Sequence, residues 1–378
     1  MGTPVYLDFN ATTPIDPEVI NEMLPYFKTG YGNPSSSYSL GRENLEAVNR
    51  ARKQVATLIN ARPEEIIFTS GGTESNNHAI LGTAIAHQGK GKHLITSEIE
   101  HPAVTNVCRH LAAQGWEITW LPVDKAGSVN PKDLESAIRP DTVLASIMHA
   151  NNEVGTIQPI KEISEVCGHY NVLLHTDAAQ STGKLETDVE ALGVDLLTIA
   201  GHKLYAPKGI GALYVKDGVD IENLMFGAGQ EKGIRPGTEN VAYIAAFGKA
   251  CEIAAANFAK NYRHMYDMRE KLLEGLLFNL KNIRLNTDLN NSLPNTLSIA
   301  FDKVDAHKLT DLISNEVYIS TGSACHSGTT EISPVLKAMK IELATAAGTV
   351  RISTGKYTTK EEIDLAIKVI SGAVQKLS

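Results

Sequence analysis

The sequence predicts an α/β protein whose large domain is built on a mainly parallel sheet. Helical patterns alternate with short β-rich segments between about residues 42 and 215, and several of these segments are apolar without alternation. Such strands are typical of a sheet that is covered on both faces, and helices between them imply βαβ units. The expected strands are residues 66–69, 93–97, 118–123, 143–148, 172–176, 195–199 and 211–215, which makes the sheet seven-stranded.

A second, smaller domain is expected because 378 residues exceed the size at which one core usually stops growing. Two consecutive helical patterns, 238–258 and 261–280, lead out of the first domain. We expect a large domain at 15–258, and a small α+β domain formed by 1–14 together with 259–378. Its elements are strands at 296–301, 317–320 and 349–353, helices at 306–315 and 359–376, and a loop around Cys325.

Composition excludes several classes of protein. The net charge of −8 argues against a nucleic-acid surface. No apolar run approaches the roughly 20 residues that span a bilayer. The first residues lack the basic and apolar regions of a secretion signal. We therefore expect a cytoplasmic protein that binds neither DNA nor a membrane.

The four cysteines lie far apart and form no C-x-x-C pair, so no metal site is predicted. Cys108, Cys167 and Cys251 are interpreted as structural residues. Cys325 lies among small and polar residues, in Thr-Gly-Ser-Ala-Cys-His-Ser-Gly. That setting suits an exposed, reactive thiol in a reducing compartment.

Two polar residues follow apolar strands where an open α/β sheet binds ligands. Lys203 ends the segment Ala-Gly-His-Lys, and burial there would lower the pKa of its amine, as a Schiff-base lysine requires. Taken alone, a turn lysine that points to solvent is the commoner interpretation. Asp177 could keep a pyridinium nitrogen protonated and so make pyridoxal phosphate (PLP) an electron sink. A helix N-cap is an equally good interpretation of Asp177.

A glycine-rich segment, Ser-Gly-Gly-Thr-Glu-Ser at 70–75, lies between a strand and a helix. Glycines let backbone N–H groups approach an anion, so Gly72 and Thr73 are candidates for holding a phosphate. The segment matches neither a Walker A sequence nor a G-x-G-x-x-G fingerprint, which disfavours ATP and dinucleotides. A capping box at Thr73 or a neighbouring residue is the alternative.

Three further side chains complete the candidate site. His101 follows a strand, and an imidazole there could stack on a cofactor and move protons, although a lone histidine is more often structural. Asn152 follows another strand and could bond a ring hydroxyl or a carboxylate. Arg351, inside a strand of the small domain, could grip a substrate carboxylate or form an ion pair within the protein.

Taken in order, these motifs resemble the cysteine desulfurases of the class V aminotransferase group, with the fold type I architecture of PLP enzymes. The resemblance covers nearly the whole chain, from Tyr-Leu-Asp-Phe-Asn-Ala-Thr-Thr-Pro at 6–14 and Gly-Asn-Pro-Ser-Ser at 32–36 onward. It implies a homodimer with shared active sites, in which Thr238 reaches the cofactor phosphate of the neighbouring subunit. The PLP ligands that it implies within the chain are Gly72, Thr73, His101, Asn152, Asp177, Gln180, His202 and Lys203.

The resemblance also implies a reaction. L-Cysteine, its carboxylate held by Arg351 and Asn152, would lose its sulfur and become L-alanine. Lys203, His101 and Cys325 would be the catalytic residues, and Cys325 would carry the sulfur as a persulfide. A sulfur-acceptor protein, such as an iron–sulfur scaffold, would then receive it.

One position departs from the family pattern. Where the family commonly has a serine that bonds the phosphate, this chain has Ala200. The lost hydroxyl should weaken phosphate binding, since a charge-assisted hydrogen bond contributes roughly 1.5–3 kcal/mol. We expect Thr73, His202, the backbone near Gly72 and the partner's Thr238 to compensate.

Three other functions fit the same residues. A selenocysteine lyase needs the same lysine, aspartate and thiol. A PLP aminotransferase or lyase would leave Cys325 unused. A non-catalytic binding or scaffold protein could keep the fold, although Lys203, Asp177, Arg351 and Cys325 together speak against it.

Overall fold

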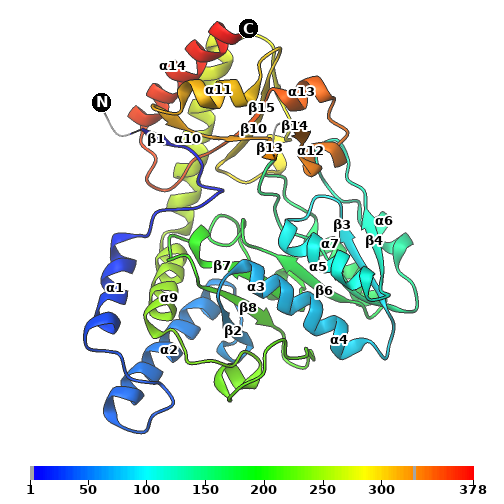
Figure 1. Cartoon of the computed structure of the whole chain (residues 1–378), viewed down its shortest axis with the longest axis vertical. Helices are drawn as coiled ribbons and strands as arrows, with labels where there is room; N and C mark the ends of the chain where they lie inside the picture. Colours follow the sequence, from blue (N-terminus) through cyan, green and yellow to red (C-terminus); the bar gives the residue numbers. More distant parts are fainter. Residues whose placement is uncertain (1–3, 327–328) are drawn as a thin grey trace.

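The computed structural model describes residues 4–326 and 329–378, without the side chains of 323–331 (Figure 1). Its large sheet has seven strands in the order β2-β8-β7-β6-β5-β3-β4, and only β8 runs against the others. The predicted α/β class and the mainly parallel seven-stranded sheet are therefore confirmed. The strands are β2 (Ile66–Thr69), β3 (His93–Ser97), β4 (Glu117–Leu121), β5 (Thr142–Ser146), β6 (Leu173–Asp177), β7 (Leu196–Ala200) and β8 (Gly211–Val215).

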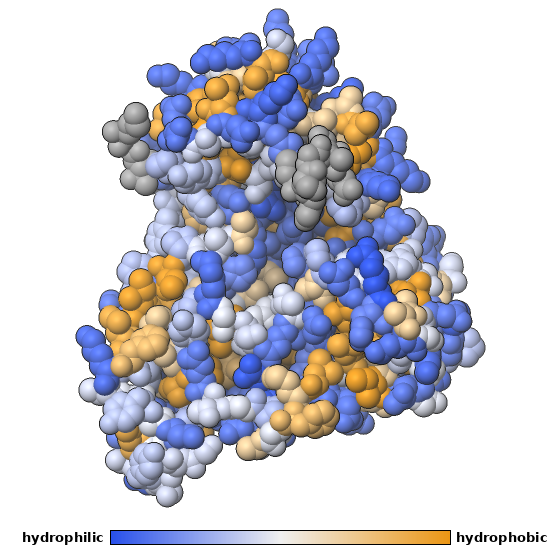
Figure 2. Space-filling model, viewed as in Figure 1, coloured by the Kyte–Doolittle hydropathy of each residue, from blue (hydrophilic) through white to orange (hydrophobic). Residues whose placement is uncertain are grey.

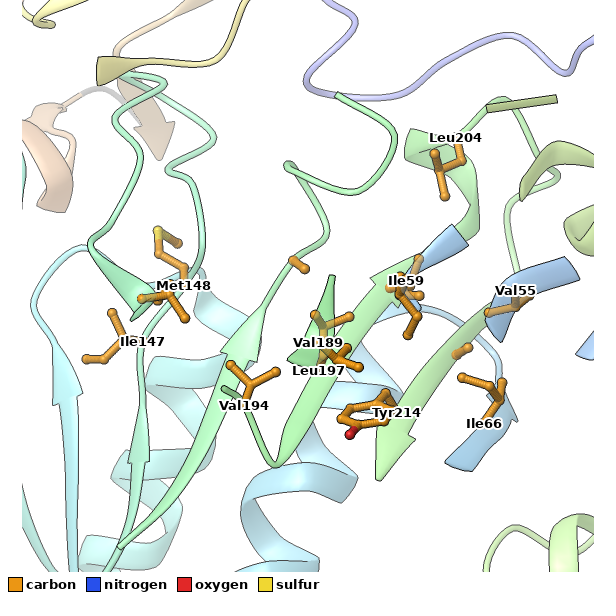
Figure 3. Packing of buried hydrophobic residues seen from close by; sticks show 14 of the residues in the cluster. Val55, Ile59, Ile66, Ile147, Met148, Val189, Val194, Leu197, Leu204 and Tyr214 are labelled. Carbon is orange, nitrogen blue, oxygen red and sulfur yellow. The ribbon is translucent and has the colours of Figure 1, made fainter. Parts of the chain in front are cut away.

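The sheet is buried on both faces, which explains its unbroken apolar strands. Along β2, Ile66 and Phe68 pack in one core while Ile67 packs in another on the opposite face, because successive side chains of a strand point to opposite sides. Figure 3 shows part of the first core, with Val55 and Ile59 packed near Leu197 and Tyr214.

Helices cover the two faces of this sheet. The first core takes in residues of α1 (Pro17–Lys28), α2 (Ser39–Leu58), α7 (Ile160–His169), α8 (Val189–Leu192) and α9 (Val241–Ala256). The opposite core takes in residues of α4 (Thr83–His87) and α5 (Pro102–Ala113). The short helix α3 (Gly72–Asn77) continues through a π-helical turn at His78–Gly82 into α4.

The expected elements are present with ends shifted by a few residues. The helix expected after the glycine-rich segment begins within it, at Gly72, and the helix expected at 238–258 begins only at Val241. Sequence reasoning did not place α1, α5, α6 (Pro131–Ala137), α7 or α8.

A smaller sheet, ordered β12-β15-β10-β9, lies beyond α10 (Phe258–Asn279), the long helix that leads upward in Figure 1. Val5 and Leu7 pack in the core of this second body, which supports the proposed pairing of 1–14 with 259–378; the boundaries themselves stay a prediction. Its strands are β1 (Val5–Tyr6), β9 (Ile283–Leu285), β10 (Thr296–Phe301), β11 (Val317–Tyr318), β12 (Ser320–Thr321) and β15 (Thr349–Ser353), and its helices are α11 (Ala306–Ile313) and α14 (Lys360–Leu377). Two short helices, α12 (Pro334–Ala338) and α13 (Leu343–Ala347), contribute Val335, Leu336 and Ala346 to the first core instead.

Two predictions about this part of the chain were wrong. The strand expected at 317–320 is divided between β11, which pairs with β1, and β12, which pairs with β15. The segment around Cys325 is not an irregular loop, because β13 (Ser323–His326) pairs antiparallel with β14 (Thr329–Ile332). The β-branched residues Thr329, Thr330 and Ile332 favour strands, a preference that the small polar residues before them obscured.

Across residues 4–326 and 329–378, no helix combines the length and the apolar character that crossing a membrane requires.

Candidate active site

A cavity of about 330 Å³ lies at the carboxyl ends of the parallel strands. The space-filling view in Figure 2 shows the surface hollowed between the two bodies. Asn10 and Ala11 of the N-terminal segment and Arg351 of β15 line the cavity from the side of the small body. The predicted site residues that line it are Gly72, Thr73, His101, Asn152, Asp177, Gln180, His202, Lys203 and Arg351.

Lys203 is directed into this cavity. It ends a short 3-10 turn, Gly201–Lys203, that directly follows β7. Its Nζ donates hydrogen bonds to the backbone oxygens of Asn10 and Ala11, the latter at 2.7 Å. Burial lowers the pKa of the amine to about 8, and the charge of Arg351 acts in the same direction. The interpretation of Lys203 as a solvent-facing turn lysine is therefore wrong.

Asp177 is the last residue of β6, the neighbour of β7 in the sheet. Its Oδ2 accepts a hydrogen bond from Asn76 Nδ2 at 2.7 Å, and its Oδ1 accepts one from the backbone N–H of Ala179 at 2.9 Å. It caps a tight turn and not a helix, since α8 begins only at Val189. The N-cap interpretation of Asp177 is therefore wrong.

His101 both caps a helix and lines the cavity. Its Nδ1 accepts a hydrogen bond from the backbone N–H of Ala103 at 3.1 Å, at the start of α5. The proton of the neutral ring therefore lies on Nε2. Partial burial lowers the pKa of His101, and the charge of Lys203 acts in the same direction. The ring is thus mainly neutral near pH 7, with an Nε2–H group as its available donor.

The glycine-rich turn leaves room for a ligand. Gly71 adopts φ +146°, which favours glycine, and a Cβ at Gly72 would lie 3.3 Å from the Cβ of Ala200. Ala200 lines the cavity beside Gly72, at the place where the family has a serine. The alternative of a capping box at Thr73 or a neighbour is not formed, because the N-cap of α3 is Gly71, which has no side chain; Glu74 Oε2 accepts the N–H of Ser70 at 2.7 Å.

His202 lies on the other side of this turn. Its Nδ1 is 3.2 Å from Thr12 Oγ1. Burial lowers the pKa of His202 to about 4, and the charges of Lys203 and Lys208 act in the same direction. His202 is therefore a neutral hydrogen-bonding group at the cavity near pH 7.

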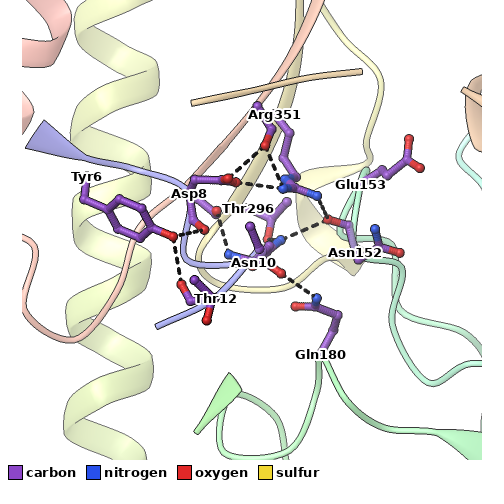
Figure 4. Close-up of polar contacts among 12 residues, drawn as sticks. Tyr6, Asp8, Asn10, Thr12, Asn152, Glu153, Gln180, Thr296 and Arg351 are labelled. Carbon is purple, nitrogen blue, oxygen red and sulfur yellow. Dashed lines mark hydrogen bonds and ion pairs between the residues drawn. The ribbon is translucent and has the colours of Figure 1, made fainter. Parts of the chain in front are cut away.

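Arg351 reaches the cavity from the small body, as Figure 4 shows. Its Nη2 donates to Asp8 Oδ1 at 2.7 Å and to Ser320 Oγ at 3.0 Å, and its Nη1 donates to the backbone oxygen of Asn152 at 3.1 Å. Its Nε is buried and has no partner within the described part of the chain. Arg351 thus forms the ion pair that we considered, yet keeps one buried donor for a ligand.

The comparisons with known proteins agree with this arrangement. The sequence model of the family described as aminotransferase class-V matches residues 5–365. The chain belongs to the class V aminotransferase family. Within that family it is 46% identical to the cysteine desulfurase IscS of Dictyoglomus turgidum, over 100% of this chain and 96% of the relative.

Solved structures of this class V group have the same fold. A NifS-like protein superposes with a TM-score of 0.93 at 38% identity, covering 99% of this chain and 100% of that protein. SspA in complex with cysteine superposes with a TM-score of 0.82 at 36% identity, covering 94% and 99%. The chain is therefore a class V enzyme of the cysteine desulfurase group, a group known to use PLP.

The structure does not place two of the predicted site residues at the cavity. Thr238 lies apart from the cavity, and the side chain of Cys325 is not among those that the structure describes. Thr238 is exposed and does not line the cavity of its own chain. Its segment is held by Arg235, whose Nε lies 2.8 Å from Glu74 Oε1. The backbone of Cys325 lies in β13, and its side chain falls outside the described residues.

Sequence reasoning missed several residues that organise this class V site. Asn10, only 1% exposed, donates from Nδ2 to Thr296 Oγ1 at 2.8 Å and accepts at Oδ1 from Asn295 Nδ2 at 3.0 Å. Asn76 orients Asp177, and Asp8 pairs with Arg351. Asp8 and Asn10 belong to the N-terminal motif that we recognised, but the motif does not say which side chains they meet.

Proposed function

We propose that this chain is a PLP-dependent cysteine desulfurase that converts L-cysteine to L-alanine and carries the sulfur as a persulfide on Cys325. The observation that carries the proposal is the shared cavity of Lys203 and Asp177, which end the neighbouring strands β7 and β6. An amine of lowered pKa beside a carboxylate, with an arginine facing them, is the set of groups that PLP chemistry on an amino acid requires.

The residues around the cavity fit PLP. Lys203 supplies an amine for the aldehyde carbon, Asp177 a carboxylate for the ring nitrogen, and His101 an aromatic ring. Gly72, Thr73 and His202 supply room and hydrogen-bond donors for the phosphate. Two buried polar atoms at the cavity, Asn76 Oδ1 and Arg351 Nε, lack partners in the described part of the chain, as expected where a polar ligand belongs.

Cysteine is the substrate that the comparisons favour. The relative from Dictyoglomus turgidum is a cysteine desulfurase, and the similar protein SspA has been solved with cysteine. The selenocysteine alternative gains no support from these proteins. Arg351 supports an amino-acid substrate, because its free Nε can bond a carboxylate.

We assign each residue one task. Arg351 and Asn152 orient the substrate carboxylate, and the Lys203 amine removes the proton from the substrate α-carbon. Bound PLP supplies the electron sink for the charge left on that carbon. Asp177 holds a proton on the ring nitrogen through its carboxylate. His101, neutral near pH 7 with its proton on Nε2, can give a proton or a hydrogen bond to the substrate sulfur from that atom.

Cys325 takes the sulfur from the substrate. Its thiolate attacks the substrate sulfur, and an S–S bond forms as the bond between that sulfur and the substrate β-carbon breaks. The electron pair of the broken bond stays with the carbon skeleton, which takes up a proton at the β-carbon and leaves as alanine. An acceptor protein such as an iron–sulfur scaffold then takes the outer sulfur of the persulfide. The exposed position of Thr238 supports a homodimer in which this residue serves the partner's site. The cytoplasmic location stays a prediction.

The test is to measure alanine and persulfide formed from L-cysteine by the purified protein, with L-selenocysteine run beside it. We expect cysteine turnover, and a Cys325→Ser variant that keeps PLP absorbance but forms no persulfide. Negligible turnover of cysteine beside rapid turnover of selenocysteine would overturn the substrate. Undiminished persulfide in Cys325→Ser would overturn the role of Cys325. A protein purified with PLP that lacks PLP absorbance would instead be a non-catalytic member of the fold.

A further inference from the structure

Lys184 is a buried cation that the proposed reaction does not use. It is 6% exposed and lies on the turn that follows Asp177, four residues after Gln180. Among the described residues, no carboxylate lies within ion-pair distance of its Nζ. Its partners are two amide oxygens, Gln180 Oε1 at 3.1 Å and Asn10 Oδ1 at 3.3 Å. A lysine buried without an acidic partner is expensive, and such groups cluster at functional sites.

The partners of Gln180 leave its amide a single orientation. Lys184 Nζ donates to Oε1, and its protonated form can only donate, so Lys184 favours the orientation in which Oε1 faces it. The backbone oxygen of Asn10 can only accept, so Nε2 must face Asn10, which it meets at 2.9 Å. Within the described part of the chain, Nε2 makes only this hydrogen bond. Because Gln180 lines the cavity, its second N–H is the group available to a ligand.

We propose that Lys184 is a positioning residue for the cofactor site, which holds the Gln180 amide so that an N–H donor, and not a carbonyl oxygen, faces an anionic oxygen of the ligand. The ring hydroxyl of PLP supplies such an oxygen, so this inference rests on the proposed function. Without Lys184, only the backbone oxygen of Asn10 would hold this orientation, so the Gln180 amide would turn over more readily and present an acceptor, which repels an anionic oxygen.

The same contacts link Lys184 to Lys203. The backbone oxygen of Asn10 accepts hydrogen bonds from both Gln180 Nε2 and Lys203 Nζ, and the Oδ1 of Asn10 accepts from Lys184. Burial lowers the pKa of Lys184 to about 7, and the charges of Lys203 and Arg351 act in the same direction. One asparagine therefore holds the cofactor lysine, the glutamine and the positioning lysine together.

The experiment is a pH titration of the visible absorbance of bound PLP in the wild type and in Lys184→Met. Loss of the fixed donor and of the nearby cation favours the protonated form of the bound cofactor, so we expect the titration midpoint to rise by about one pH unit, a tenfold change in proton affinity. Lys184→Arg should keep the midpoint within a few tenths of a unit. Lys161→Met, which removes an exposed lysine of α7 that lines neither cavity, is the control and should also leave it unchanged.

A second, smaller cavity is lined by Lys184, Lys203 and Lys356. The other ionisable groups around the two cavities stay in place in every variant, so they do not account for a difference between variants. They are Asp8 of the N-terminal segment, His101 at the start of α5, Asp177 of β6, His202 and Lys203 after β7, Arg351 of β15, and Lys356 with its partner Asp16.

A double-mutant cycle with Gln180→Leu tests the route through Gln180. If Lys184 acts by orienting that amide, Lys184→Met should shift the midpoint far less in the Gln180→Leu background than in the wild type. Equal shifts in the two backgrounds would overturn the proposal. An unchanged midpoint with a lowered unfolding temperature of the PLP-free protein would also overturn it, because Lys184 would then be only structural.

If Lys184→Met does not fold, a second variant, Lys184→Gln, tests the same proposal. Lys184→Gln keeps a polar side chain that can either donate or accept, so it also releases the orientation of Gln180 and should raise the midpoint. A wild-type protein with no PLP absorbance would overturn the proposed function together with this inference. If the absorbance of PLP bound to the wild type changes with pH and every variant has the same midpoint, this inference alone would be overturned.

Discussion

Arg351 Nη2 donates to Asp8 Oδ1 at 2.7 Å, while the Nε of the same guanidinium is buried and has no partner in the described residues. The two side chains are 12% and 18% exposed. Asp8 therefore holds one edge of the guanidinium and leaves another for a carboxylate. The arginine is oriented before the substrate arrives, which reduces the entropy lost on binding.

Replacing Arg351 by lysine should raise the KM for cysteine by about 10- to 100-fold, the loss expected for a charge-assisted pair of hydrogen bonds. A lysine keeps the charge opposite Asp8 but has no Nε donor in the guanidinium plane. Steady-state kinetics measures the effect, and retained PLP absorbance shows that the site is otherwise intact. A KM within threefold of the wild type would rule out carboxylate binding by Arg351.

The lowered pKa of Lys203 predicts how the PLP-free protein takes up PLP. A neutral amine attacks the aldehyde, so the uptake rate should rise with pH through a midpoint near 8, not near the ordinary value of 10.5. Uptake at pH 7 should be about tenfold slower than at pH 9. Stopped-flow absorbance measures this rate. Because the Arg351 charge lowers the pKa of Lys203, Arg351→Ala should move the midpoint upward. A wild-type rate that still rises steeply above pH 9 would contradict the prediction.

Ala200→Ser should tighten PLP binding about tenfold, because a restored hydroxyl contributes about 1.5 kcal/mol to a phosphate contact. Ala200 lines the cavity, and its Cβ lies beside Gly72, which has no side chain to block a hydroxyl. Titrating the PLP-free protein with PLP gives the dissociation constant. Ala200→Val adds bulk without a donor and is the control, for which weaker binding is expected. Unchanged affinity in Ala200→Ser would mean that the phosphate lies elsewhere.

Much of the fold could be predicted from sequence because it depends on local patterns. Apolar runs such as Ile66–Thr69 predict strands that are covered on both faces. Lys203 and Asp177 lie at the ends of such runs. The carboxyl ends of parallel strands share one edge, so these residues were expected to meet. The strand of Cys325 was missed because small polar residues conceal its pairing with the threonines of β14.

The rest of the site depends on contacts between distant parts of the chain. Asn10 meets Gln180 across 170 residues and Asn295 across 285 residues. Nothing near Lys184 in the sequence indicates that it is buried without a carboxylate, and nothing near Asn76 indicates that it orients Asp177. The Asn10 contacts require the N-terminal segment to lie beside both bodies, and the Asn76–Asp177 contact requires α3 to lie beside β6.

Three of the four thiols should be unreactive in the native protein. Burial raises the pKa of Cys108 and Cys167 to about 12 and raises that of Cys251 further, and all three are at most 2% exposed. The thiolate is the reactive form, so iodoacetamide at pH 7 should label one cysteine per chain, Cys325, as mass spectrometry would show. All four should be labelled after unfolding. Labelling of native Cys325→Ser would contradict this account.

Thr238 makes the proposed dimer testable, because its exposed side chain does not line the cavity of its own chain. Thr238→Ala should weaken PLP binding about tenfold through loss of a phosphate contact. The decisive sample is a hybrid dimer of one Thr238→Ala chain and one Lys203→Ala chain. Its single intact lysine lies in the Thr238→Ala chain, and the threonine beside that site would come from the partner.

We therefore expect the hybrid to hold one PLP per dimer with wild-type affinity, while the Thr238→Ala homodimer binds PLP weakly at both sites. Tagging the two chains differently allows the hybrid to be purified, and PLP titration gives both stoichiometry and affinity. If Thr238 acted within its own chain, the one working site of the hybrid would bind as weakly as the Thr238→Ala homodimer. Wild-type affinity in the homodimer itself would mean that Thr238 contacts neither phosphate.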